Sequence, residues 1–259
     1  MAKQVIFADL DGTFLDDQYG FSQTRVIADE VTGLGGSVVF CSSKTRHEIE
    51  FYREATGNKE PFIAENGAAI FIPKNYFKVP FDSKATSKYH VIRLGSPYRA
   101  LRSKLARIKR LTSAKIIGFG DMTLEELAFE TGLPLNLAKL AKKREHGEPF
   151  RIIEGNRLHV FSAIKNEGLQ CVRGGRYLHL TGATDKGKAA LILKNLYLEM
   201  FGRIETYGVG DGPNDYSMLK VVDNPFFIDK TQFNARLNAW VAILSCIKSA
   251  VRADKQRKV

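Results

Sequence analysis

The first apolar run of the chain ends in two aspartates. Residues 5–8 read Val-Ile-Phe-Ala, and the residues that follow are Asp9, Leu10, Asp11, Gly12 and Thr13. A short continuous apolar run is typical of a strand buried on both faces of a parallel sheet, and open α/β sheets bind ligands at the carboxyl ends of such strands. Because neighbouring carboxylates repel each other, a cation is the simplest reason to place the pair there. The alternative is an acidic turn that caps the next segment.

The following segments complete a βαβ unit. Residues 22–34 favour a helix that ends at a pair of glycines, and residues 37–41 are rich in β-branched and aromatic side chains, which predicts a second buried strand. A second helix is expected over residues 44–55 and a strand pair over residues 61–72. These patterns predict an α/β core with a Rossmann-like parallel sheet.

A second acidic loop follows a predicted strand late in the chain. Residues 208–215 read Gly-Val-Gly-Asp-Gly-Pro-Asn-Asp, so the strand expected over residues 205–209 ends beside Asp211, Asn214 and Asp215. Two acidic loops at two strand ends form a credible set of oxygen ligands for Mg²⁺. Taken by itself, the loop could also be an Asp-Gly turn followed by a helix cap.

A hydroxyl and a lysine stand at two further element ends. Ser42 follows the second predicted strand and offers a hydroxyl, although it could also be the N-cap of the next helix. Lys186 begins a long helical pattern over residues 186–201. A cation there is unfavourable for the helix dipole, so a phosphate partner would account for it. An ordinary solvated lysine is the alternative.

The middle of the chain has a different pattern. Helices are expected over residues 97–111, 123–131 and 135–144, and strands over residues 89–94, 150–154, 157–163, 170–173 and 177–180. Strands that cluster and helices that pair indicate an α+β module. The stretch from Ser42 to Lys186 takes up more than half of the 259 residues, far more than a crossover connection needs. We therefore expect a whole domain to be inserted there.

Composition narrows the functional class. Hydrophobic residues make up 44% and charged residues 26% of the chain, which predicts a globular protein with a sizeable core. Three dispersed cysteines match neither a disulfide framework nor a zinc motif. We find no apolar run long enough to span a bilayer and no signal-peptide pattern, so we expect a cytoplasmic protein without a membrane partner. The net charge of +11 favours anionic partners.

In this order and at these positions, the four signals resemble the haloacid dehalogenase (HAD) superfamily of phosphotransferases. The resemblance implies that Asp9 is the nucleophile and that Asp11 is the general acid and base. It implies that Ser42 and Lys186 bind the phosphoryl group. The ligands it implies for Mg²⁺ are Asp9, Asp11, Asp211 and Asp215.

The resemblance also accounts for the insertion. Cof-like phosphatases of the superfamily carry an α/β cap at this place. This implies an HAD-like catalytic core over residues 1–82 and 181–259, and an inserted α+β cap domain over residues 83–180. Such a cap would cover the site, exclude water and bind the leaving group.

Narrower motifs are similar to those of the mannosyl-3-phosphoglycerate phosphatases. They are the segments 41–46 (Cys-Ser-Ser-Lys-Thr-Arg), 64–67 (Ala-Glu-Asn-Gly), 143–150 (Lys-Arg-Glu-His-Gly-Glu-Pro-Phe) and 174–180 (Gly-Gly-Arg-Tyr-Leu-His-Leu). The similarity implies a phosphoric monoester hydrolase that converts mannosyl-3-phosphoglycerate to mannosylglycerate, a compatible solute, through an aspartyl-phosphate.

Candidate substrate-binding residues come from the same motifs and from the second acidic loop. Lysine and arginine suit the carboxylate or phosphate of such a substrate, and carboxylates and amides suit its sugar hydroxyls. The cationic candidates are Lys44, Arg46 and Arg144; the candidates for sugar hydroxyls are Glu65, Asn66 and Glu148; the remaining candidates are Ser43 and Asn214.

Two other functions stay open. The first is a phosphatase of another sugar phosphate, such as glucosyl-3-phosphoglycerate, a hexose phosphate or a disaccharide phosphate. The second is a nucleic-acid-binding protein on a degenerate scaffold, which the net charge and the basic face of residues 97–111 suggest. A solvated cap helix explains that face more simply, and we find no nucleic-acid-binding motif, so we expect no nucleic-acid partner. A monomer and a homodimer are both compatible with the sequence.

Overall fold

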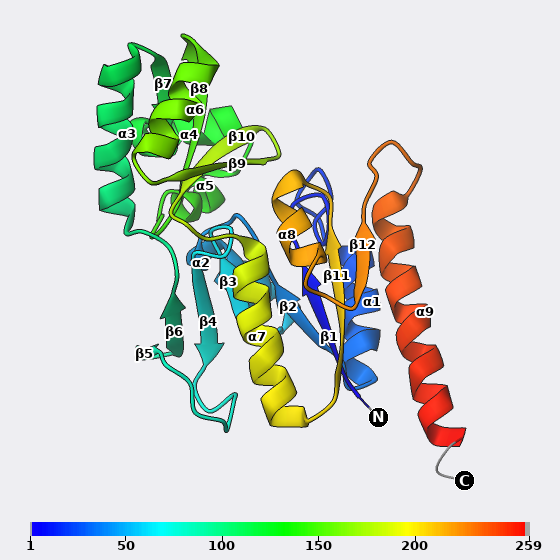
Figure 1. The fold of residues 1–259 in the computed structure, drawn as a ribbon. Helices are drawn as coiled ribbons and strands as arrows, with labels where there is room; N and C mark the ends of the chain where they lie inside the picture. Colours follow the sequence, from blue (N-terminus) through cyan, green and yellow to red (C-terminus); the bar gives the residue numbers. More distant parts are fainter. Residues whose placement is uncertain (1, 257–259) are drawn as a thin grey trace.

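The computed structural model describes residues 2–256, and its larger part is an α/β core built on parallel strands (Figure 1). The strands pair in the order β12-β11-β1-β2, and all neighbours are parallel. Their bounds are β1 Lys3–Ala8, β2 Ser37–Phe40, β11 Ile204–Gly210 and β12 Asn224–Phe227. The predicted Rossmann-like core is thus confirmed.

Antiparallel strands continue the core beyond β2. Cys41 forms a single bridge to Ile63, and the next strands pair in the order β3-β4-β6-β5. Their bounds are β3 Phe62–Ala64, β4 Ala69–Pro73, β5 Lys84–Ala85 and β6 Tyr89–Arg93. The backbone N–H of Asn66 donates to Ser42 O (3.0 Å), which places the turn between β3 and β4 beside the end of β2.

Helices cover both faces of the central strands. On β1, Val5 and Phe7 belong to the buried cluster that includes α7 and α8, whereas Ile6 and Ala8 belong to the cluster that includes α1 and α9. This alternation is that of a strand buried on both faces. The bounds are α1 Ser22–Gly33, α2 Arg46–Thr56, α7 Lys186–Phe201, α8 Tyr216–Leu219 and α9 Ala235–Gln256.

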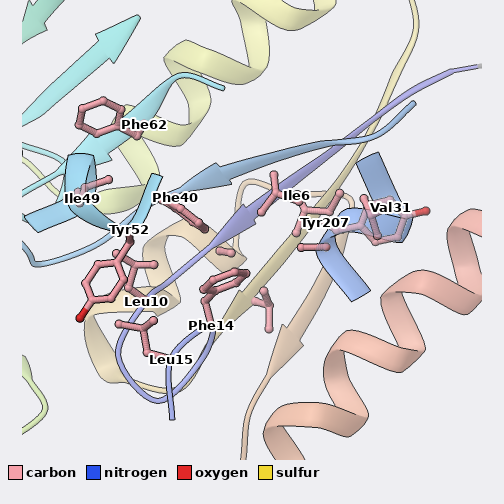
Figure 2. Close-up of a cluster of buried hydrophobic side chains, with 14 of the residues drawn as sticks. Ile6, Leu10, Phe14, Leu15, Val31, Phe40, Ile49, Tyr52, Phe62 and Tyr207 are labelled. Atoms are coloured by element: carbon pink, nitrogen blue, oxygen red, sulfur yellow. The ribbon is translucent and has the colours of Figure 1, made fainter. Parts of the chain in front are cut away.

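An aromatic cluster lies beside the loop that follows β1 (Figure 2). The Phe14 side chain is 1% exposed, and its ring centroid lies 4.9 Å from that of Phe40 and 5.6 Å from that of Trp240. Burial of one such side chain contributes about 1.5–3 kcal/mol. The indole N–H of Trp240 donates to Thr13 O (3.1 Å). Helix α9 therefore helps to hold the loop that carries the two aspartates.

The middle of the chain folds into a separate antiparallel sheet with its own core. Its strands pair in the order β7-β8-β10-β9. Helices α3 and α6 contribute to one hydrophobic cluster with this sheet, and α4 and α5 form a second cluster around Phe119. The bounds are β7 Lys115–Gly118, β8 Glu148–Glu154, β9 Gln170–Gly174, β10 Tyr177–Thr181, α3 Tyr98–Thr112, α4 Leu124–Thr131, α5 Leu135–Ala141 and α6 Arg157–Asn166. We call this unit the cap.

Two details of the middle region differ from the sequence prediction. Residues 157–163, expected as a strand, belong to helix α6, which Asn156 caps by accepting the N–H groups of Leu158 (2.9 Å) and His159 (3.3 Å). Strands β5 and β6 pair with the core through β4, so strand pairing starts the cap later than the expected residue 83. Residues 1 and 257–259 of the predicted core lie outside the described part of the chain.

The carboxyl ends of β1, β2 and β11 point toward the cap (Figure 1). The hairpin of β9 and β10 reaches back to the core and contacts the short 3-10 helix η2, Pro213–Asp215, which follows β11. The strand ends are thus enclosed between two units. Within residues 2–256, no helix has the length and apolarity that a membrane span requires.

Candidate active site

The loop after β1 is held in a tight conformation by backbone hydrogen bonds. The N–H of Asp9 donates to Val209 O (3.0 Å), and the N–H of Leu15 donates to Leu10 O (2.7 Å). Gly12 has a φ of +71°, and a Cβ at this position would lie 2.4 Å from Asp211 Oδ2. Glycine is therefore required both by the backbone conformation and by the close approach of the second acidic loop.

Lys186 lies between two buried carboxylates. Its Nζ is 2.7 Å from Asp9 Oδ1 and 2.6 Å from Asp215 Oδ1, and all three side chains are buried. Burial by itself would lower the pKa of Lys186, but the attraction of Asp215 and Asp9 outweighs that effect and raises it above its ordinary value. The lysine therefore carries its charge, and its place at the start of α7 is explained by its two carboxyl partners.

Asp215 shapes the second acidic loop. Its Oδ2 accepts the backbone N–H groups of Asp211 (3.1 Å) and Gly212 (2.9 Å), while its Oδ1 pairs with Lys186. Both oxygens are therefore engaged within the protein. Asp211 forms an ion pair with Lys230, which comes from the segment after β12.

Three carboxylates converge at the ends of β1 and β11. One oxygen each from Asp9, Asp211 and Asp215 lies within 4.8 Å of the others. Burial raises the pKa of Asp9 to about 8 against the opposing pull of Lys186, and the charges of Asp215 and Asp211 add to the increase. Crowded carboxylates of this kind gain from a hard cation, and carboxylate oxygens are the ligands that Mg²⁺ takes, so the residues present fit a Mg²⁺ site.

Ser42 lies at the end of β2, fully buried beside this cluster of strand ends. Its backbone N–H donates to Ile63 O (3.0 Å), and its Oγ accepts the N–H of Lys44 (3.2 Å). Ser42 is not the N-cap of α2: Thr45 fills that position and forms a capping box with Glu48. The alternative role considered for the Ser42 hydroxyl therefore does not apply.

Lys44 contacts the second aspartate of the first loop. Its Nζ is 2.9 Å from Asp11 Oδ1 and 3.5 Å from Glu48 Oε1, and it lies 5.0 Å from the ring centroid of Tyr19 and 5.8 Å from that of Tyr52. Burial opposes the charge, but Asp11 and Glu48 raise the pKa of Lys44 above its ordinary value. A buried cation therefore stands next to Asp11.

A cavity of about 490 Å³ lies between the strand ends and the cap. Of the residues assigned from the sequence, the cavity lining includes Asp9, Asp11, Ser43, Lys44, Arg144, Asp211 and Asn214. Asn214 Nδ2 donates to Asn66 Oδ1 (3.0 Å), which ties the second acidic loop to the turn after β3. The lining therefore combines both acidic loops with residues of the cap.

Arg144 and Glu65 join the cap to the core. Arg144 Nε lies 3.3 Å from Glu65 Oε2 and donates to Gly147 O (2.9 Å), and its guanidinium also donates to Ser43 O (3.1 Å). Glu65 accepts the backbone N–H groups of Glu145 (2.8 Å) and His146 (3.0 Å). Both carboxylate oxygens of Glu65 are thus occupied by protein donors, although the sequence suggested sugar hydroxyls as partners.

Arg46 and Glu148, also assigned from the sequence, do not line the cavity. Arg46 pairs with Glu145 (2.8 Å) and Glu50 (3.3 Å). Glu148 is fully buried in the cap, where it accepts from Tyr98 (2.8 Å), Arg102 (2.7 Å) and the N–H of Gly120 (2.9 Å). The structure therefore places Arg46 at the border of core and cap and Glu148 inside the cap.

Several cavity residues were not singled out from the sequence. They are Asp16, Asp17, Tyr19, Arg176, Tyr177, His179 and Lys230. The loop after β1 supplies the first three, and the β9–β10 hairpin supplies the next three, which lie in the segment 174–180 already noted as a motif. Burial, with a contribution from Arg144, lowers the pKa of His179 to about 3, so this imidazole is neutral at physiological pH.

The basic face of α3 is largely occupied within the cap. Arg102 pairs with Asp121 (2.5 Å) as well as Glu148, and Lys109 also pairs with Asp121 (2.7 Å). Arg107 pairs with Glu167 (3.1 Å). Much of the basic face of this helix is therefore paired with acidic groups of the cap itself.

Comparisons with known proteins find a matching family model and similar phosphatases. The family model of the haloacid dehalogenase-like hydrolases matches residues 6–93. A glucosyl-3-phosphoglycerate/mannosyl-3-phosphoglycerate phosphatase from Methanococcoides burtonii is 42% identical over 88% of this chain and 85% of the relative. A mannosyl-3-phosphoglycerate phosphatase from Pyrococcus horikoshii is 36% identical over 95% of this chain and 99% of the relative.

A solved structure from another organism has a similar fold. A protein from Thermoplasma acidophilum matches with a TM-score of 0.65 at 17% sequence identity, and the match covers 96% of this chain and 99% of that chain. At this identity the match concerns the fold, including both core and cap.

Proposed function

The chain belongs to the mannosyl-3-phosphoglycerate phosphatase family of the haloacid dehalogenase-like hydrolases, and from this premise we propose that it hydrolyses mannosyl-3-phosphoglycerate with the aid of Mg²⁺. It is a sugar phosphatase, and thus a phosphoric monoester hydrolase. The observation that carries the proposal is the buried Asp9–Lys186–Asp215 arrangement, which adjoins Asp211 beside a cavity that the cap helps to line.

Asp9 and Asp11 divide the proposed chemistry. A carboxylate oxygen of Asp9 attacks phosphorus, the bond from phosphorus to the glycerate oxygen breaks, and Asp11 gives that oxygen a proton. In the second step, Asp11 takes a proton from water while the water oxygen attacks phosphorus. The bond from phosphorus to the Asp9 oxygen breaks, which restores the Asp9 carboxylate and frees inorganic phosphate. The tight turn at Gly12 supports this division because it brings both aspartates to the cavity.

The surrounding residues position and neutralise the phosphoryl group. Lys186 holds Asp9 at 2.7 Å and supplies positive charge beside it, and the buried Ser42 offers its hydroxyl at the end of the neighbouring strand. Mg²⁺ would be held by Asp9, Asp211 and the loop at Asp11, with Asp215 behind them, and would supply charge neutralisation of the transferring phosphoryl group. Phosphoryl transfer depends chiefly on such positioning and charge stabilisation.

The cavity offers cations for the rest of the anionic substrate. Arg144 from the cap and Lys44 from the core both line it. A guanidinium and an ammonium suit a glycerate carboxylate, and Asn214 and Ser43 offer polar groups beside them. Arg46, Glu65 and Glu148 lie outside the cavity lining and use their charged groups within the protein, so we assign them a supporting place rather than contact with the substrate.

Glucosyl-3-phosphoglycerate is a second candidate substrate. The relative from Methanococcoides burtonii is named for both the glucosyl and the mannosyl compound, and it shares 42% of its residues with this chain over the aligned region. The two compounds differ only in the configuration at one carbon of the sugar, and their phosphate and glycerate groups are the same. We propose that the protein accepts both, with the cap deciding the ratio.

The test is phosphate release from a substrate panel with Mg²⁺ present. The panel contains mannosyl-3-phosphoglycerate, glucosyl-3-phosphoglycerate, mannose 6-phosphate, trehalose 6-phosphate and 3-phosphoglycerate. Asp9→Asn removes the nucleophile, and Asp29→Asn on the exposed face of α1 is the matched control. We expect the glycosyl-3-phosphoglycerates to react best, Asp9→Asn to be inactive and EDTA to abolish turnover. Equal turnover of simple hexose phosphates would contradict the proposed substrate and leave the phosphatase chemistry in place.

A further inference from the structure

The segment after β12 brings a second lysine to the acidic loops. The N–H of Ile228 donates to Gly210 O (2.8 Å), which continues the pairing of this segment with β11. Asp229 then accepts from the backbone (3.0 Å) and hydroxyl (2.7 Å) of Thr231, and this turn carries Lys230. The backbone path therefore delivers the Lys230 side chain to the end of β11, where Asp211 lies.

Lys230 and Lys186 contact the carboxylate cluster in different ways. Lys186 is fully buried and bridges Asp9 and Asp215, so it is a permanent part of the core. The Lys230 side chain is 57% exposed, lines the cavity and forms its ion pair with Asp211 Oδ2, whose side chain is 9% exposed. Lys230 can therefore leave Asp211 for the cavity without breaking the packing of the core.

The same carboxylate belongs to the set that fits Mg²⁺. An oxygen of Asp211 lies within 4.8 Å of oxygens of Asp9 and Asp215, and Asp211 Oδ2 also faces Gly12 closely. An ammonium group and a divalent cation repel each other and need the same electron pairs of the carboxylate. Occupation of Asp211 by one therefore opposes occupation by the other.

We infer that Lys230 competes with the metal for Asp211, so that this lysine sets the Mg²⁺ affinity of the site. The inference rests on the metal site of the proposed function. When Mg²⁺ binds, Lys230 turns away from Asp211 toward the cavity that it already lines. Its charge is then available to the anionic substrate, which links metal binding to substrate binding.

Substitution of Lys230 tests the competition directly. In Lys230→Met the competing ammonium group and its repulsion of the cation are both lost, so Mg²⁺ should bind more tightly. Because ion pairs with an exposed partner are weak, we expect the Mg²⁺ dissociation constant to fall by about two- to fivefold. Lys220→Met, at an exposed position after α8, makes the same change in net charge and should leave the constant near that of the wild type.

The Mg²⁺ dissociation constant is measured by isothermal titration calorimetry of each protein with MgCl₂, without substrate. A second readout is the free energy of unfolding in EDTA and in saturating Mg²⁺: the gain from Mg²⁺ should be larger in Lys230→Met than in the wild type. An unchanged or weaker Mg²⁺ affinity in Lys230→Met would overturn the inference, since it would make Lys230 neutral or a positioning residue for Asp211. A wild type that fails to bind Mg²⁺ would instead contradict the metal site of the proposed function.

Discussion

Lys186 supplies the positive charge between the buried carboxyl groups of Asp9 and Asp215, and this gives a first residue-level prediction. Its Nζ lies within 2.7 Å of oxygens of both Asp9 and Asp215. In Lys186→Met the side chain keeps its bulk, but the buried carboxyl groups of Asp9 and Asp215 lose their cation. Because removal of one partner from a buried ion pair costs about 3–5 kcal/mol, we expect the free energy of unfolding to fall by about that amount. Urea denaturation followed by circular dichroism measures it.

The same helix provides the control for this variant. Lys188→Met removes an exposed lysine of α7 and should change stability by no more than about 0.5 kcal/mol. Phosphatase activity should fall steeply in Lys186→Met and stay near the wild-type level in Lys188→Met. Equal stability of the two variants would show that Lys186 does not balance the carboxylates.

A second residue-level prediction concerns pH. Burial raises the pKa of Asp9 from 3.8 to about 8, so between these values the folded protein holds a proton that the unfolded chain releases. The free energy of unfolding therefore falls as the pH rises through this window. Asp9→Asn, an isostere of the protonated form, should match the wild type near pH 4 and be more stable than it at pH 8. Unfolding in EDTA across this range tests the prediction, and a difference independent of pH would contradict it.

The proximity of several site residues could be predicted from the sequence, because parallel strands end at one edge of a sheet. This argument brings together Asp9, Ser42 and Asp211 from three strand ends, and the structure shows their strands as neighbours. Lys230 could not be found in this way. Its place depends on the path of the segment after β12, and a single lysine in such a segment has no distinctive pattern. The roles proposed for all these residues stay predictions.

At the scale of elements, a short alternation of apolar and polar residues led to one wrong prediction, a strand where the structure has a helix. Residues 157–163 read Arg-Leu-His-Val-Phe-Ser-Ala, which alternates in part like a strand, yet they form the first turns of α6. The buried positions Val160 and Ile164 are four residues apart, as on one face of a helix, and Asn156 is a favoured N-cap. Packing of α6 against α3 and the cap sheet decided between the two patterns.

The segment that joins α5 to β8 makes the prediction at this scale. The buried Glu65 accepts two of its backbone N–H groups and pairs with the buried Arg144. Glu65→Ala leaves these donors unpaired, which costs about 1.5–3 kcal/mol for bonds to a charged group. We expect amide hydrogen exchange over residues 144–147 to become at least about tenfold faster. Mass spectrometry detects the change, and Glu54→Ala, at an exposed site on α2, should not produce it.

At the scale of the whole molecule, spacing predicts an inserted unit, and strand pairing suggests a first border other than the expected one. The expected border at residue 83 places β5 and β6 in the cap, whereas β6 pairs with β4 and β5 pairs with β6. Strand pairing across a sheet is a long-range choice that the local pattern does not contain. By strand pairing, the two connections between core and cap follow Arg93 and Thr181, and we propose this division in place of the first one.

These two connections lie against each other. We therefore expect a substitution at their contact to move the cap without changing the catalytic residues of the core. A Cβ on Gly182 would lie 2.8 Å from Ser96 Oγ and 2.9 Å from Ser96 N, so Gly182→Ala forces the connections apart and shifts the cap. We expect kcat/KM for mannosyl-3-phosphoglycerate to fall by about tenfold to a hundredfold, because small misplacements of binding groups cost that much. Turnover of p-nitrophenyl phosphate, which needs few cap contacts, should change little. Gly33→Ala in α1, where a Cβ meets no neighbour within 4 Å, is the control. An equal loss on both substrates would show that Gly182 acts on the catalytic core rather than on the placement of the cap.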